Sequence, residues 1–63
     1  MRNLFEIRQE VYNGRTLYVV WRGNKDEMSF ATTAAAETYL EAREDGYSKH
    51  AAYRVAASGL SYA

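Results

Sequence analysis

The chain has no cysteine and no proline, its charges balance, and no long apolar run interrupts it. Without cysteine there is no disulfide scaffold, no thiol nucleophile and no Cys-ligated zinc site. Eight Lys and Arg residues oppose eight Asp and Glu residues, whereas bulk binders of nucleic acid normally have a strong basic excess. No stretch approaches the ~20 apolar residues of a membrane span, and the first residues lack the apolar run of a secretory signal. We therefore expect a cytoplasmic protein without a membrane segment.

The 63 residues allow one small domain, residues 1–63, with a modest core. Much of the 48% hydrophobic content is Ala, and six residues are Tyr, so large aliphatic side chains are few. Ordering the chain costs roughly 95 kcal/mol, a sum that a small domain barely offsets. We therefore expect a folded domain that gains stability by self-association, as a homodimer or larger homo-oligomer.

Two β-strands joined by a tight turn are predicted at residues 4–12 and 16–22, which are rich in β-branched and aromatic residues. Asn13 and Gly14 between them are a strong hairpin signal. A two-residue turn would mix polar and apolar side chains on each face, so we prefer a three-residue loop, 13–15, which separates them. One face is then nearly all apolar and carries Phe5 and the pairs Val11–Leu17, Gln9–Val19 and Ile7–Trp21. This register places Trp21 in the core.

Further strands would complete the sheet. Apolar and polar residues alternate in a short third strand at about 27–31, after a turn. The following Ala-rich segment is ambiguous, because Ala favours a helix whereas its larger side chains alternate with a charged one. We interpret 52–57 as a fourth strand, and a second helix beginning near Ser48 is the alternative. Residues 58–63 resemble a frayed tail.

A helix is predicted at about 34–45. Thr32 or Thr33 can accept a hydrogen bond from an exposed backbone N–H at its start, and Gly46 can end it in the left-handed conformation. Its apolar stripe consists of Ala35, Ala36, Tyr39, Leu40 and Ala42, with Arg43 on the edge. The whole pattern predicts the α+β class. We expect a three- or four-stranded antiparallel sheet with one α-helix packed on one face, in the order ββ(β)αβ.

Enzymatic chemistry has little support in this sequence. His50 is the only histidine and stands beside Lys49 without a neighbouring carboxylate, so we interpret it as an exposed loop residue. No nucleophile with a matching base and no metal-ligand set is visible, and the glycines do not form a phosphate loop. We therefore expect no catalytic residues, no metal and no cofactor.

Two surfaces are candidates for binding. Glu37, Glu41 and Glu44 are four and three residues apart on the predicted helix and form an acidic helix face, either merely solvated or able to dock a basic partner. On the hairpin, the preferred register gathers a second set, here named the hairpin face: Arg8, Tyr12, Arg15, Tyr18, Val20 and Arg22. Tyr and Arg dominate protein interfaces, and they also contact phosphates and stack on bases.

These observations favour a small non-enzymatic interaction or regulatory protein, of a size often found among inhibitory or accessory proteins of bacteria and their mobile elements. It would bind a partner protein through the hairpin face, the acidic helix face or a sheet edge. The alternative is a small nucleic-acid-binding protein that uses the basic and aromatic hairpin, which the lack of net charge disfavours.

Overall fold

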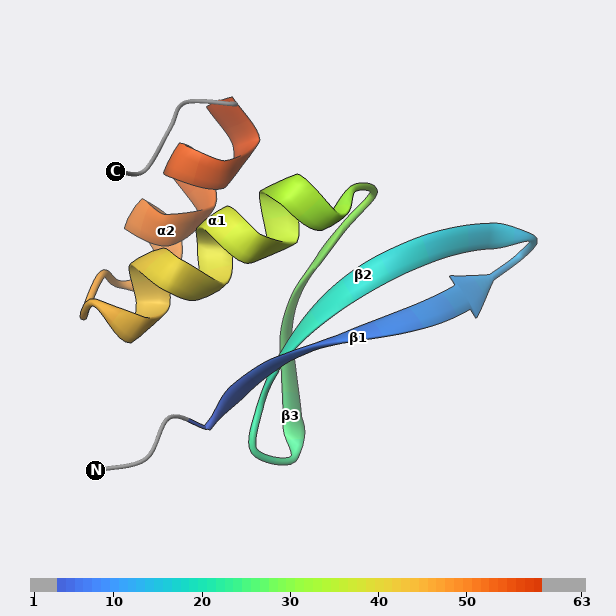
Figure 1. Ribbon diagram of the computed structural model, residues 1–63, viewed down its shortest axis with the longest axis horizontal. Helices are drawn as coiled ribbons and strands as arrows, with labels where there is room; N and C mark the ends of the chain where they lie inside the picture. The colour runs from blue at the N-terminus through green and yellow to red at the C-terminus, as the bar shows by residue number, and fades with distance from the viewer. Residues whose placement is uncertain (1–3, 59–63) are drawn as a thin grey trace.

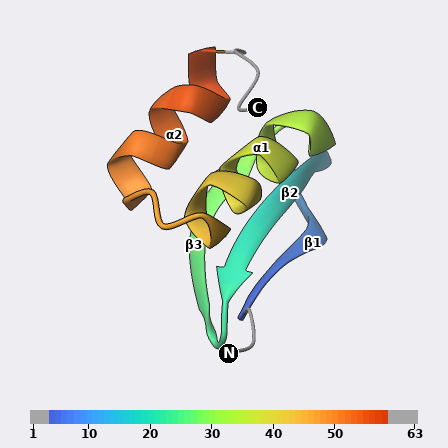
Figure 2. The ribbon, with the colours of Figure 1, turned by 60° about the vertical axis from the view of Figure 1, so that its left-hand side comes forward.

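The computed structural model describes residues 4–58 and has five elements (Figure 1). In chain order they are β1 (Phe5–Tyr12), β2 (Arg15–Arg22), β3 (Lys25–Phe30), α1 (Thr33–Glu44) and α2 (Lys49–Ser58). The strands form one antiparallel sheet with β2 in the middle. Helix α1 lies over one face of the sheet, and α2 packs beside α1 (Figure 2). The α+β class and the antiparallel sheet are confirmed.

Residues 52–57 belong to α2, so the fourth strand is wrong and the alternative of a second helix near Ser48 is right. The Ser48 hydroxyl accepts a hydrogen bond from the Ala51 N–H at 3.2 Å, which caps the helix start. Ala52 and Ala56 lie four residues apart and are both buried, because this spacing turns them to the same side of a helix. Helix propensity and this packing together outweigh the alternation of larger side chains. Ser58 ends α2, and the rest of the expected tail lies outside the described residues.

The hairpin turn has two residues rather than three. Tyr12 pairs with Arg15, and both Asn13 (φ 50°) and Gly14 (φ 78°) have positive φ, as a type I′ turn requires. The predicted loop 13–15 is therefore wrong. The turn geometry that Asn-Gly favours determines the register here, more strongly than the separation of polar from apolar side chains.

This register exchanges the two faces of β2 relative to the prediction. Ile7 lies opposite Val20, and Trp21 lies opposite Glu6. Val20 consequently faces α1 and is fully buried, whereas Trp21 lies on the face that neither described helix covers. We name this second surface the open face. Its members are Glu6, Arg8, Glu10, Tyr12, Arg15, Leu17, Val19, Trp21, Asp26 and Ser29.

The core is small and lies between the sheet and α1. Tyr39 and Val20 are its largest fully buried side chains, and the Phe30 ring lies 5.5 Å from that of Tyr39. The rest is mainly alanine, which lets the helices approach closely: Ala36, Ala42, Ala52 and Ala56. Helix α1 begins as expected, since the Thr32 hydroxyl accepts from the Ala35 N–H at 3.2 Å. It ends before Gly46, whose φ is 98°. No helix within residues 4–58 has the length and apolar character to cross a membrane.

Helix α2 depends on close alanine contacts with α1, so enlarging one of them should displace it. We expect Ala52→Leu to lower the free energy of unfolding by about 1–3 kcal/mol, because the buried site has no room for three more carbons. Ala57→Leu adds the same group at an exposed position of the same helix and should change stability by about 0.5 kcal/mol or less. Urea unfolding measures both, and equal effects of the two changes would contradict this packing.

Candidate functional site

The open face contains a tryptophan that is held in place by charged neighbours. The Trp21 indole N–H donates to the Glu10 carboxylate at 3.0 Å, and the Arg8 guanidinium lies 4.5 Å from the ring centroid. Arg8 is also paired with Glu6. Trp21 thus remains only partly covered, between one cation and one carboxylate, with Val19 buried beside it. Such a mixture of aromatic, apolar and charged groups is typical of protein-binding surfaces.

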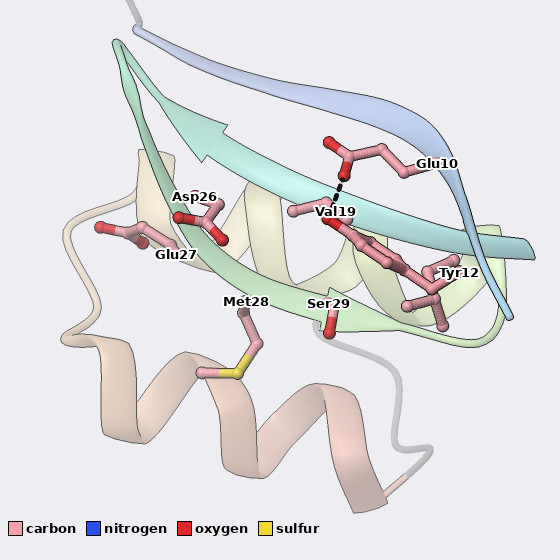
Figure 3. Close-up of a pocket in the computed structure, with 8 residues that line it drawn as sticks. Glu10, Tyr12, Val19, Asp26, Glu27, Met28 and Ser29 are labelled. Carbon is pink, nitrogen blue, oxygen red and sulfur yellow. Dashed lines mark hydrogen bonds between the residues drawn. The ribbon is translucent and has the colours of Figure 1, made fainter.

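A hollow of about 360 Å³ opens beside this tryptophan, between the end of β1 and strand β3 (Figure 3). Leu17, Val19 and Met28 supply its apolar lining. Its polar lining consists of Glu10, Tyr12, Asp26, Glu27 and Ser29. Three of those residues are acids, of which Glu27 is bound to Arg43, so Glu10 and Asp26 supply the free negative charge. Among residues 4–58, no Lys, Arg or His lines the hollow. The hollow therefore combines an apolar surface with negative charge.

The pKa of Tyr12 is shifted by the same negative charge. The Tyr12 hydroxyl donates to Glu10 at 3.2 Å, and this bond, the Glu10 charge and, more weakly, the Asp26 charge raise the pKa of Tyr12 above its ordinary value. The Asp26 carboxylate itself has no hydrogen bond or ion pair to any residue in the described part of the chain. An exposed, unpaired carboxylate at the edge of an apolar hollow is available to a cation from outside the chain.

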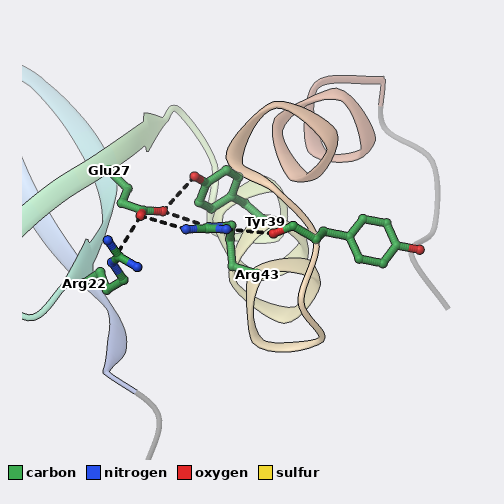
Figure 4. Close-up of polar contacts among 5 residues, drawn as sticks. Arg22, Glu27, Tyr39 and Arg43 are labelled. Carbon is green, nitrogen blue, oxygen red and sulfur yellow. Dashed lines mark hydrogen bonds and ion pairs between the residues drawn. The ribbon is translucent and has the colours of Figure 1, made fainter.

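Glu27, which follows Asp26, points toward α1, where its carboxylate is bound by Tyr39 and Arg43 (Figure 4). One carboxylate oxygen accepts from the Tyr39 hydroxyl at 2.9 Å and from Arg43 Nε at 3.0 Å, and the other accepts from Arg43 Nη2 at 3.0 Å. Arg22 Nε lies 3.5 Å from the second oxygen. The Glu27 side chain is only 6% exposed. These four residues, the Glu27 cluster, tie β2, β3 and α1 together.

The Glu27 cluster shifts the pKa values of its members. Burial alone would raise the pKa of Glu27, but the hydrogen bonds from Arg43 and Tyr39 and the charges of Arg43 and Arg22 outweigh it and hold the pKa below its ordinary value. Burial, followed by the bond to Glu27, raises the pKa of Tyr39 to about 12. Glu27 is therefore an anion and Tyr39 a neutral donor at neutral pH, which matches the hydrogen bonds seen.

The predicted hairpin face is not one surface, because the register divides it. Arg8, Tyr12 and Arg15 lie on the open face. The other three residues lie on the face toward α1, where Val20 is fully buried, Arg22 belongs to the Glu27 cluster, and Tyr18 packs against the core. Val20 and Tyr18 therefore do not belong to an exposed binding surface as predicted.

The acidic helix face remains one surface, since Glu37, Glu41 and Glu44 are all exposed on α1. His50 is exposed too, although it lies in the first turn of α2 rather than in a loop. Within residues 4–58, no three His, Asp or Glu side chains lie close enough together to hold a metal ion.

Neither the hollow nor the Glu27 cluster was predicted from the sequence. Asn13-Gly14 was the signal for the hollow, because a strict two-residue turn would have placed Leu17, Val19 and Trp21 together with Glu10. Arg43 on the edge of the apolar stripe of α1 was the signal for the cluster, since a half-buried arginine needs an acidic partner. Comparison with protein-family models, with curated proteins and with solved structures finds no match.

The Glu27 cluster should make stability depend on acid pH. Because the folded state lowers the pKa of Glu27, the stabilisation is present above the ordinary value of 4.5 and is lost as the pH falls through the folded value. We expect Glu27→Gln to cost about 3 kcal/mol at pH 7, since it leaves Arg43 half-buried without its anion. The variant should also show a smaller loss of stability in acid than the parent chain.

Urea unfolding between pH 3 and pH 7 measures both effects. Glu44→Gln removes the same charge from an exposed position of α1 and serves as the matched control, with an expected change of about 0.5 kcal/mol or less. A parent chain and a Glu27→Gln variant with parallel pH profiles would contradict the stabilising role of the cluster.

Proposed function

We propose that this chain is a small non-enzymatic interaction protein that binds a partner protein through the open face of its sheet. In this proposal the hollow receives a lysine or arginine side chain of the partner. The observation that carries the proposal is the composition of the hollow: an apolar lining, the acids Glu10 and Asp26 without an arginine partner, and no cation among residues 4–58. The chain would act by occupying its partner's surface, in a regulatory, accessory or inhibitory role.

Both the aliphatic stem and the charged end of a basic side chain find matching groups in this hollow. Lys and Arg have an aliphatic stem that packs on apolar surface while the charged end reaches polar groups. Val19 and Leu17 offer that apolar surface, and the unpaired Asp26 carboxylate offers a charge-assisted hydrogen bond. The partly covered Trp21 next to the hollow adds an aromatic anchor of the kind that dominates interface energetics.

The same lining weighs against the two other surfaces considered from the sequence. Phosphate groups would meet the carboxylates of the hollow, and Arg22 of the expected basic hairpin is turned to the opposite side, where it pairs with Glu27. The acidic helix face has the right sign for a basic partner, but none of its three residues lines the hollow. The open face is therefore favoured over both.

Selection of ligands from a displayed library of random peptides tests the proposal directly. We expect the parent chain to enrich peptides with a Lys or Arg flanked by apolar residues. Asp26→Arg should weaken the binding of those peptides by about tenfold or more, because it places a cation in the hollow. Fluorescence anisotropy with one enriched peptide measures the loss.

Glu41→Arg is the matched control, since it makes the same change of charge on the acidic helix face. It should leave the affinity within about twofold. If Glu41→Arg abolished binding and Asp26→Arg did not, the helix face would be the interface. Affinity for duplex DNA that falls steeply with added salt, together with no peptide enrichment, would favour the nucleic-acid alternative.

A further inference from the structure

Strand β1 has a free edge that is long and unprotected. Within residues 4–58 it pairs only with β2, over eight residues and without a bulge. Proteins usually guard an exposed edge with lysine, proline, a bulge or a short strand. The opposite edge, β3, has such devices, namely Lys25 at its start and a bulge at Glu27. β1 has no lysine, proline or bulge, and the charges that it carries on Glu6, Arg8 and Glu10 alternate in sign, so a strand with matching charges can pair with it.

The hairpin turn determines which backbone groups point outward from β1. In a type I′ turn the carbonyl of the first residue, Tyr12, accepts from the N–H of the last, Arg15. Hydrogen-bonded and non-bonded pairs then alternate along an antiparallel pair, so the even-numbered residues of β1 bond to β2. The odd-numbered residues, among them Ile7, Gln9 and Val11, direct their N–H and C=O groups outward.

We infer that the occupant of this edge is a second copy of the chain, whose β1 pairs antiparallel with the first about a two-fold axis at Gln9. In this register Arg8 of each copy lies opposite Glu10 of the other. Ile7 of each copy lies opposite Val11 of the other. The two ion pairs lie on the open face and the two apolar pairs lie on the face toward α1, so each face gains a favourable cross-strand contact. The pattern of β1 is therefore self-complementary.

Neighbouring registers lack this match. Moving the axis to Arg8 places Arg8 opposite its own copy and Glu6 opposite Glu10, so like charges meet on the open face. Moving it to Ile7 pairs Glu6 with Arg8 but leaves Val11 beyond the end of the other β1. Val11 is 65% exposed in the single chain. An axis at Arg8 would also cover it, with Phe5, but only the axis at Gln9 combines apolar cover from Ile7 with pairs of opposite charge.

The placement of the helices leaves room for the second copy. The hairpin projects beyond the helices at the end that carries the turn, whereas α1 lies nearer the opposite end of β1 (Figure 1). There the Arg43 guanidinium lies 5.3 Å from the centroid of the Phe5 ring. With the axis at Gln9, the helices of the two copies lie toward opposite ends of the paired strands. Each projecting hairpin end then lies beside the helix-covered part of the other copy.

The side chains of the ion pairs have unused capacity. The bond from Arg8 to Glu6 uses Nε, so the terminal nitrogens of the guanidinium can meet Glu10 of the second copy. Arg8 remains 49% exposed in the single chain. Each carboxylate oxygen of Glu10 accepts one hydrogen bond and can accept another.

A charge exchange between two variants tests both the association and its register. Sedimentation equilibrium should give a dimer for the parent chain, with twice the chain mass of 7.2 kDa. Arg8→Glu and Glu10→Arg each place like charges opposite one another and should weaken association by about tenfold or more. In a mixture of the two variants, positions 8 and 10 of opposite copies again carry opposite charges, so a heterodimer should form. Native mass spectrometry identifies it by its mass.

Gln9→Pro provides a test that does not depend on charge. It removes an outward N–H that β2 does not use, so the single chain should keep its circular dichroism spectrum while the dimer is lost. A parent chain that stays monomeric into the millimolar range would overturn the inference, and so would charge variants that fail to complement each other. Asp26 lies outside the β1 edge, so peptide binding at the hollow is measured with the Asp26→Arg variant independently of dimerisation. Loss of one of these two properties would not imply loss of the other.

Discussion

The turn at Asn13 and Gly14 determines which side of the sheet each residue of β1 and β2 occupies. Both residues have positive φ, and the turn closes between Tyr12 and Arg15 without an extra residue. Side chains alternate with a period of two, so one more residue in the turn would exchange the faces of one strand. The buried Val20, the partly covered Trp21 and the composition of the hollow all depend on this short loop.

Burial of apolar side chains between the sheet and the helices contributes less to the stability of this fold than it does in larger domains. The interface between α1 and α2 is built largely from alanines, which bring the two helices close together but bury little apolar area. The Glu27 cluster compensates by linking β2, β3 and α1 through one buried carboxylate. Such a cluster is specific because its geometry is satisfied in one arrangement only, and every buried polar side-chain atom of the described residues has a partner.

The elements of this fold were largely predictable from the sequence, whereas the faces were not. Local signals gave two strands, a short third strand and α1, because capping by Thr32 and termination near Gly46 depend on a few adjacent residues. The second helix was ambiguous because Ala52 and Ala56 are decided by packing on α1, which no local pattern encodes. The hairpin register was wrong because separation of polar from apolar side chains was given more weight than turn geometry. This one error in the predicted register placed Trp21 in the core and left the hollow unpredicted.

The bulge in β3 places the adjacent acids Asp26 and Glu27 on different sides of the sheet, where they have different roles. Trp21 pairs with Asp26 and Val20 pairs with Met28, so Glu27 is the extra residue and turns toward α1 while Asp26 stays on the open face. Asp26 has no bond within the described chain, so its sign and size can change without cost to the fold. Glu27 can change only together with Arg43. In related sequences, the residue at position 26 can therefore change when the binding partner changes. The residues at positions 27 and 43 must instead change together.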